Sequence, residues 1–245
     1  PKKQGGLALP NPIQYYWACN INKIGHWLDR GADAGPSWVL TELRSSKFSL
    51  PSLLTARLPL KIHNVSQNPV VTNSLKIWNQ FRKHYGLNEP STLAPVVKNH
   101  LFPPSSTDPT FTIWRDKGLL YVKDLYKENK FTDFTELAAR FELPNSHFFR
   151  YLQVRHFVQT AYPHFPNHPP GSLSDSLLAL DPSQKRSISV IYNSIDSLNP
   201  DQTTRLKQTW EQEMGVPVSD DQWVQILELV HTSSICARHS LLQCK

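Results

Sequence analysis

The sequence predicts a mainly helical protein with little or no sheet. Apolar residues recur at three- and four-residue spacing in several stretches, as they do along one face of an amphipathic helix, whereas the alternating patterns typical of strands are scarce. The chain has 20 prolines and nine glycines, and proline cannot continue a helix. We therefore expect an irregular helical array joined by proline-rich linkers.

The first segment, residues 1–60, contains one clear helix near its start. Asn11 as N-cap and Pro12 at the first helical position favour a helix start, because the side-chain oxygen of the cap satisfies a free backbone N–H and proline has none to satisfy. A short helix is expected over 37–44, and the Leu/Pro-rich residues beyond it have no firm assignment. The stripe of the first helix, which ends before a break over 31–35, comprises Ile13, Tyr16, Trp17, Ile21, Ile24 and Leu28.

The second segment, residues 61–161, is predicted to hold the aromatic and basic helices. A helix is expected after Asn68-Pro69, with Thr72 or Asn73 as its cap and with Gly86 as the left-handed residue that follows its end. Its apolar face comprises Leu75, Trp78, Phe81 and Tyr85. A connection rich in proline and serine follows, and then short amphipathic pieces up to about residue 126.

Residues 130–156 have the densest aromatic pattern and predict two helices with a break between them. Thr132 or Asp133 is expected to cap the first start, and Asp133 and Glu136 form a capping-box-like pair. Pro144 ends this helix because proline disfavours helical geometry in the residue before it. The helical spacing of the aromatics predicts that they face a core. The first helix carries Phe134, Leu137 and Phe141, and the second, capped by Asn145 or Ser146, carries Phe148, Phe149, Tyr151, Leu152 and Phe157.

Residues 162–185 are predicted to be a linker, and residues 186–245 a set of C-terminal helices. The linker contains the run YPHFPNHPP, whose prolines exclude a continuous helix, and then a serine-rich segment. The C-terminal helical patterns begin near Ile188, Asn199 and Ser219. The chain lacks an initiator methionine and stops inside a helical pattern, so we expect a truncated fragment.

The composition gives a moderate preference for polyanionic partners. Lys and Arg number 26 against 20 Asp and Glu, for a net charge of +6 and a pI of about 9.2. The three cysteines are odd in number and widely spaced, which argues against a disulfide framework and favours a reducing compartment. No apolar run is long enough to span a membrane and no secretory signal pattern is present, so we expect an intracellular protein without membrane contact.

No catalytic group stands out. The pair Asp220-Asp221 has the form of a two-metal polymerase ligand set, but acidic residues in a first helical turn offset the helix dipole, and Ser219 with Gln222 has capping-box spacing. We favour capping. The closest pair of histidines, His164 and His168, lacks the further ligands that a zinc site requires. We therefore predict no enzyme activity and no cofactor for this fragment.

Two clusters contain candidate nucleic-acid contacts. Arg82 and Lys83, beside His84, are able to neutralise phosphates, but cations in a last helical turn also stabilise the negative end of the dipole. Arg150, Arg155 and His156 lie among aromatics, and the two arginines are about 140° apart around a helix. Phosphate binding and a solvated helix face both remain open for them.

Several stretches, in order along the chain, resemble one family. They are GGLALPN at 5–11 followed by YYWA, the run FFRYLQVRHF at 148–157, WEQEM at 210–214, and then Ser234, Arg238, Gln243 and Lys245. Together they look like the post-thumb region of the reverse-transcriptase polyprotein of non-LTR (LINE-type) retrotransposons in its fish-like form. Pro12 and Thr209 depart from the pattern, where an aromatic residue and a lysine are expected.

The resemblance implies an accessory role rather than catalysis. The parent polyprotein would be an RNA-directed DNA polymerase with an endonuclease, using Mg²⁺ in its palm, and this fragment would contain neither site. The implied partners are RNA, an RNA/DNA duplex and the polymerase thumb, with a cytoplasmic and nuclear location. Arg238 joins the candidate RNA contacts on this basis. The competing hypothesis is a structural or protein-interaction helical domain with no nucleic-acid contact.

Overall fold

The computed structural model describes residues 11–28, 36–58, 65–163, 172–199 and 202–232. Within these ranges the protein is mainly helical, as the sequence predicts. The strands are two-residue pieces, β1 (Tyr126–Lys127) and β2 (Lys130–Phe131), which pair antiparallel with Tyr126 opposite Phe131. No helix among the described residues is both long enough and apolar enough to cross a membrane.

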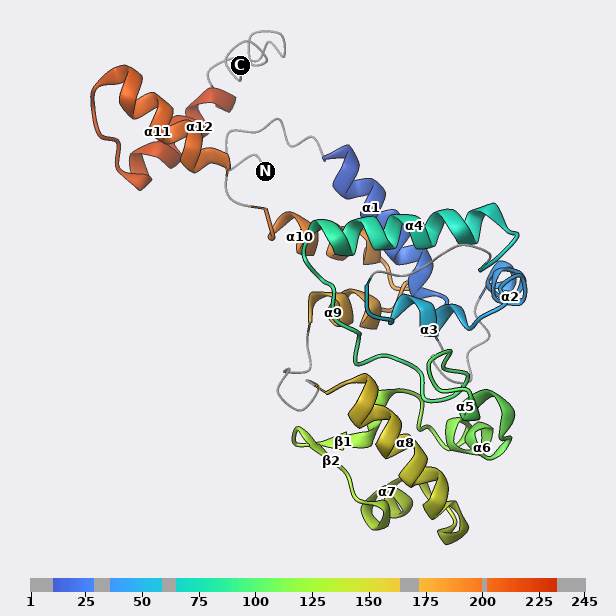
Figure 1. The fold of residues 1–245 in the computed structure, drawn as a ribbon. Helices are drawn as coiled ribbons and strands as arrows, with labels where there is room; N and C mark the ends of the chain where they lie inside the picture. Colours follow the sequence, from blue (N-terminus) through green and yellow to red (C-terminus); the bar gives the residue numbers. More distant parts are fainter. Residues whose placement is uncertain (1–10, 29–35, 59–64, 164–171, 200–201, 233–245) are drawn as a thin grey trace. The chain divides into compact units, whose positions relative to one another are not determined.

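Twelve α-helices are described (Figure 1). In the first half of the chain they are α1 (Pro12–Gly25), α2 (Ser37–Arg44), α3 (Leu50–Leu54), α4 (Pro69–His84), α5 (Pro104–Thr107) and α6 (Thr110–Asp116). In the second half they are α7 (Phe134–Phe141), α8 (Phe148–Ala161), α9 (Leu173–Ala179), α10 (Ser187–Asp196), α11 (Gln202–Met214) and α12 (Asp220–Thr232). Short 3-10 helices cover Val122–Leu125 and Asn145–His147.

The chain divides into two compact units, which differ from the four predicted segments. One unit contains residues 17–191, and the other contains residues 1–16 and 192–245. Within the second, α11 and α12 contact each other through Trp210 and Trp223, whose ring centroids are 5.6 Å apart.

The larger unit contains two groups of helices. We call residues 17–91 the α4 region and residues 92–163 the α8 region. In the α4 region, α4 packs against α1, with the rings of Trp17 and Phe81 5.7 Å apart. The buried side chains here include Ile21, Ile24, Trp27, Val39, Leu50, Leu54, Val71, Leu75, Trp78 and Phe81.

The α8 region has its own hydrophobic core. α8 lies beside α7 and the β1–β2 hairpin (Figure 1), and Phe157 of α8 stacks on Phe102 at 4.8 Å. The core includes Val96, Phe111, Trp114, Leu119, Val122, Leu125, Leu137, Tyr151, Val154 and Val158. Hydrogen bonds join this region to the α4 region, such as that from His100 N to Ser52 Oγ at 3.0 Å.

Helix starts follow local sequence signals, with some shifts. Asn11 Oδ1 accepts from Ile13 N at 3.0 Å, which confirms the predicted cap of α1. Asp133 Oδ1 accepts from Glu136 N at 2.8 Å, so Asp133 rather than Thr132 caps α7. α4 begins earlier than predicted, because Asn68 rather than Thr72 or Asn73 caps it. Gly86 has the predicted left-handed conformation, with φ of 67°.

Part of the predicted linker 162–185 is folded. Residues 173–179 form α9, which begins after Ser172, whose hydroxyl accepts from Asp175 N. Leu177 and Leu178 are buried. The serine-rich composition concealed this helix because the serines cap it and pack within it, while two adjacent leucines supply its apolar contact.

Candidate nucleic-acid interface

α8 contains three of the predicted contacts and has apolar side chains on more than one side. Tyr151, Val154 and Val158 are buried, as expected for an inward face. By contrast, Phe149 is 75% exposed and Phe148 is 43% exposed. The prediction that the aromatics of this helix face a core is therefore right for Tyr151 and wrong for Phe149. The helix has too many apolar residues for a single buried face.

Arg150 holds α8 against the segment that leads into α6. Its Nε donates to Asp108 Oδ2 at 2.8 Å, and Asp108 Oδ1 also accepts from Thr110 N at 2.9 Å. Hydrogen bonds from Thr110 hold the pKa of Asp108 below its ordinary value; desolvation opposes them, and the contact with Arg150 adds a further lowering. Arg150 thus has a structural partner, in place of the predicted phosphate contact.

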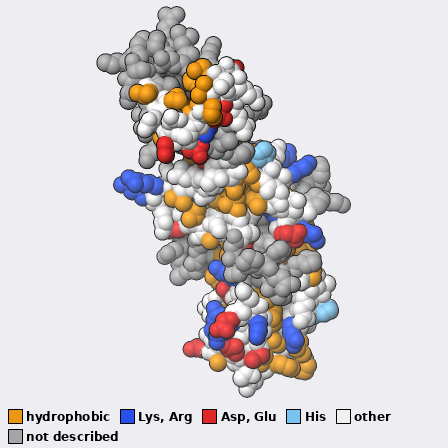
Figure 2. All heavy atoms as spheres, turned by 90° about the vertical axis from the view of Figure 1, so that its left-hand side faces the viewer, with side chains coloured by type: hydrophobic (Ala, Val, Ile, Leu, Met, Phe, Trp, Pro, Cys, Tyr) orange, Lys and Arg blue, Asp and Glu red, His pale blue; other side chains and the backbone are white. Residues whose placement is uncertain are grey.

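Arg155 and His156 remain on the solvent side of α8. Both are exposed, and they lie one to two turns beyond Phe149 and Leu152, which is 38% exposed. The sequence of α8, FFRYLQVRHFVQTA, contains no acidic residue. In Figure 2 the part of the surface that Figure 1 assigns to α7 and α8 has hydrophobic side chains along one edge, with basic, acidic and histidine side chains nearby. This face combines an open aromatic ring with cations.

Arg82 is not a surface residue. It is 1% exposed, although the sequence places it in a basic last turn. Its guanidinium donates to four backbone carbonyls, those of Ala56 (2.7 Å), Glu89 (2.8 Å), Leu87 (2.9 Å) and Leu54 (3.4 Å). Burial lowers the pKa of Arg82 to about 10, against opposing effects of Asp175 and Glu89. Arg82 therefore closes the end of α4 onto the loops beside it, and its prediction as a phosphate contact is wrong.

Lys83, the next residue, is exposed on α4. It lies seven residues, or about 10 Å along the axis, from Lys76, which is also exposed. α4 itself contains no Asp or Glu. Lys83 therefore remains a candidate contact, whereas Arg238 lies outside the described residues.

His147 is a buried titratable group that sequence reasoning missed. It is 8% exposed, and its Nδ1 accepts from Trp114 Nε1 at 3.0 Å. Burial, and then Arg150, lower its pKa, with Asp108 opposing. No sequence signal marks this residue, because Trp114 is 33 positions away.

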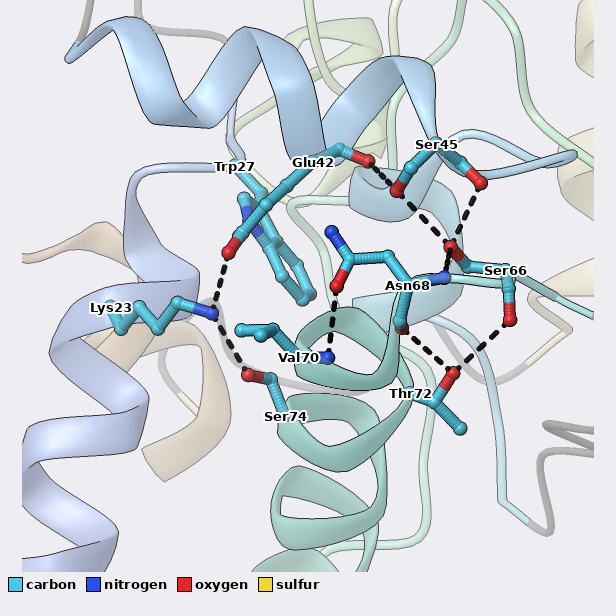
Figure 3. Close-up of polar contacts among 9 residues, drawn as sticks. All are labelled: Lys23, Trp27, Glu42, Ser45, Ser66, Asn68, Val70, Thr72 and Ser74. Atoms are coloured by element: carbon cyan, nitrogen blue, oxygen red, sulfur yellow. Dashed lines mark hydrogen bonds and ion pairs between the residues drawn. The ribbon is translucent and has the colours of Figure 1, made fainter.

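A polar network joins α1, α2 and α4 (Figure 3). Glu42 is 8% exposed, and its carboxylate receives Lys23 Nζ at 2.9 Å and Trp27 Nε1 at 2.7 Å. Lys23 also donates to Ser74 Oγ at 3.1 Å and lies over the rings of Trp27 and Trp38. Both carboxylate oxygens are thus occupied from within the chain, so we assign Glu42 to helix packing rather than to acid–base chemistry.

Two further clusters have the residue types of active sites but not their geometry. Ser52 Oγ lies 2.5 Å from His100 Nδ1, yet Ser52 is 2% exposed and its oxygen also accepts from His100 N. At Asp220-Asp221, Ser219 and Gln222 exchange hydrogen bonds in the predicted capping box. Among the described residues no group of three or more His, Cys, Asp or Glu is arranged to hold a metal ion.

The comparisons with known proteins return no match. No family model, no curated protein and no solved structure matches this chain.

Proposed function

We propose that this chain is a non-catalytic helical region of a LINE-type reverse transcriptase that supports RNA binding beside the polymerase thumb. The observation that carries this proposal is the solvent face of α8, on which Phe149, Arg155 and His156 are exposed on a helix without acidic residues. Guanidinium and imidazole N–H groups donate to phosphate oxygens, and a nucleobase can stack on an exposed aromatic ring. The RNA template and its duplex with cDNA are the proposed ligands.

The charge distribution supports the same proposal. Residues 17–91 contain nine Lys and Arg against four Asp and Glu, and residues 164–245 contain six against nine. In the described part of 17–91, the side chains of Glu42 and Glu89 are engaged by Lys23 and Arg57. Exposed cations such as Lys76 and Lys83 are therefore available for a polyanion.

A structural or protein-interaction domain is the second candidate. It is favoured by the internal use of Arg82 and Arg150, which removes two of the predicted phosphate contacts. On this hypothesis the excess positive charge is incidental and the exposed apolar side chains of α8 contact another protein.

The discriminating experiment measures RNA affinity as a function of salt. Fluorescence anisotropy of a labelled single-stranded RNA of mixed sequence is expected to show binding by the full chain that weakens steeply with salt, because bound phosphates release counterions. The double variant Arg155→Glu with His156→Glu is expected to bind at least about tenfold more weakly and with a shallower salt dependence.

Lys185→Glu is the control, because Lys185 is exposed and lies on neither α4 nor α8. The Lys185→Glu protein is expected to change RNA affinity by no more than about two- to threefold. Circular dichroism checks that all variants keep their helices. Equal affinities for the two charge-reversal proteins would remove α8 from the proposal. No binding at low salt would favour the protein-interaction hypothesis.

A further inference from the structure

Phe149 contributes little to the packing of its own domain. It is the most exposed large hydrophobic residue of the described chain, at 75%. Its neighbour Phe148 packs its ring 5.4 Å from that of Phe134 and 6.3 Å from that of Tyr151. The ring of Phe149 contacts only the outer side of this cluster, at 6.1 Å from Phe148. One face of Phe149 is therefore open to a ligand.

The residues around Phe149 form a strip along α8. Leu152 and His156 follow it at three and seven positions, so all three lie on neighbouring turns of one side of the helix. Arg155 lies beside Leu152 at the edge of this strip. The distance from Phe149 to His156 is about 10 Å along the helix axis, which a short stretch of extended nucleic acid spans.

The chemistry of the strip distinguishes single strands from duplexes. A base stacks on an aromatic side chain only if its face is exposed, and in a duplex both faces of each internal base are covered by neighbouring pairs. A surface that bound a duplex backbone would need cations alone, whereas this strip begins with an aromatic ring and ends with N–H donors. α8 itself contributes no Asp or Glu to this surface.

We infer that the solvent face of α8 binds single-stranded RNA, with one base stacked on Phe149 and the adjacent phosphates bound by Arg155 and His156. This inference rests on the proposed function and narrows it: of the two proposed ligands, the face of α8 binds the unpaired RNA template rather than the duplex. Base stacking on the ring provides affinity without sequence preference, because every base has an aromatic face.

The test compares two ring variants on two probes. The probes are a labelled single-stranded RNA of mixed sequence and the same strand annealed to its complementary DNA. The full chain is expected to bind the single strand at least about fivefold more tightly than the duplex. Phe149→Leu, which keeps an apolar side chain but removes the ring, is expected to weaken single-strand binding about 5- to 100-fold, whereas Phe149→Trp retains it.

Leu101→Ala is the control, since Leu101 is 50% exposed in the same region and is not a residue of α8. It is expected to bind like the unmodified chain. Equal binding of both probes, or a Phe149→Leu protein that binds the single strand like Leu101→Ala, would overturn the inference while leaving RNA binding in place. If neither probe binds at low salt, the proposed function itself fails. Because Phe149→Trp keeps an aromatic ring at the same site, a folded Trp variant that loses binding also contradicts stacking.

Discussion

α4 and α8 have similar sequences in outline and different structural outcomes. Each combines aromatic residues with arginine and has no acidic residue: α4 has two aromatic residues and Arg82, and α8 has four aromatic residues with Arg150 and Arg155. α4 buries Arg82 almost completely, whereas α8 leaves Arg155 in solvent and uses Arg150 in a half-exposed ion pair. The neighbours of an arginine in the sequence therefore do not determine whether it is available to a ligand.

The difference arises from the backbone groups that each helix meets. The end of α4 lies against the loop after α3 and the turn at Gly86, where the carbonyls of Leu54, Ala56, Leu87 and Glu89 need donors. A guanidinium has five N–H groups in a fixed fork and can satisfy several carbonyls at once. Around α8 the carbonyls of Thr132 and His156 accept from Tyr151 and Thr160, and Arg155 is exposed to solvent.

The largest effect is expected at Arg82. Arg82→Ala removes the donor of four buried carbonyl bonds and is expected to lower the free energy of unfolding by roughly 3–5 kcal/mol. Lys83→Ala, one residue further and exposed, is expected to change it by less than about 0.5 kcal/mol. Urea denaturation followed by circular dichroism measures both. Equal stabilities of the two variants would mean that the carbonyls find water instead, and Arg82 would again be a candidate surface cation.

Much of the fold follows from local sequence signals. Asn11-Pro12, Asp133 with Glu136, and Gly86 each specify a helix boundary through a bond or a backbone angle within a few residues, and all are found as predicted. The break before α8 is also found, although α7 ends at Phe141 with Glu142 in the left-handed conformation, before Pro144 is reached. Such signals need no knowledge of the tertiary structure.

The candidate site was less predictable because its determinants are distant in sequence. Arg82 is buried by carbonyls up to 28 positions away, and Glu42 is paired with Lys23 from another helix. Phe149 and Tyr151 are both aromatic and two positions apart, but Tyr151 is buried with its hydroxyl donating to the carbonyl of Thr132, whereas Phe149 is 75% exposed. Periodicity identifies a set of apolar residues, and the surrounding helices decide which of them are covered.

A smaller loss of stability than at Arg82 is expected from the inward side of α8, and almost none from its exposed side. Phe157 stacks on Phe102 and lies against the core, so Phe157→Ala is expected to lower the free energy of unfolding by roughly 2–3 kcal/mol through lost packing. Phe149→Ala is expected to change it by less than about 0.5 kcal/mol, because the ring is exposed. Thermal and urea unfolding of the two variants give the comparison. A comparable loss in Phe149→Ala would show that its ring is covered in solution.

The smallest effect concerns acid stability of the α8 region, where His147 has no counterpart in α4. The indole N–H of Trp114 can only donate, so Nδ1 of His147 must be unprotonated to accept it. Burial, and then the nearby Arg150, lower the pKa of His147, while Asp108 acts in the opposite direction. In the unfolded chain the same ring has its ordinary pKa of about 6.5. The unfolded state therefore takes up a proton first as the pH falls, and the stabilisation is complete above about pH 6.5 and is lost below it.

His147→Gln should consequently lose stability more gently between pH 7.5 and 5.5 than the unmodified chain. One proton contributes at most about 1.4 kcal/mol per pH unit, so the difference in slope has this upper limit. Burial also lowers the pKa of His100, and His100 remains in both proteins as a common background. His156→Gln is the matched control, since His156 is exposed on α8 and its replacement is expected to leave the slope unchanged. Urea unfolding at a series of pH values provides the slopes, and parallel curves for all three proteins would mean that protonated His147 keeps its place beside Trp114.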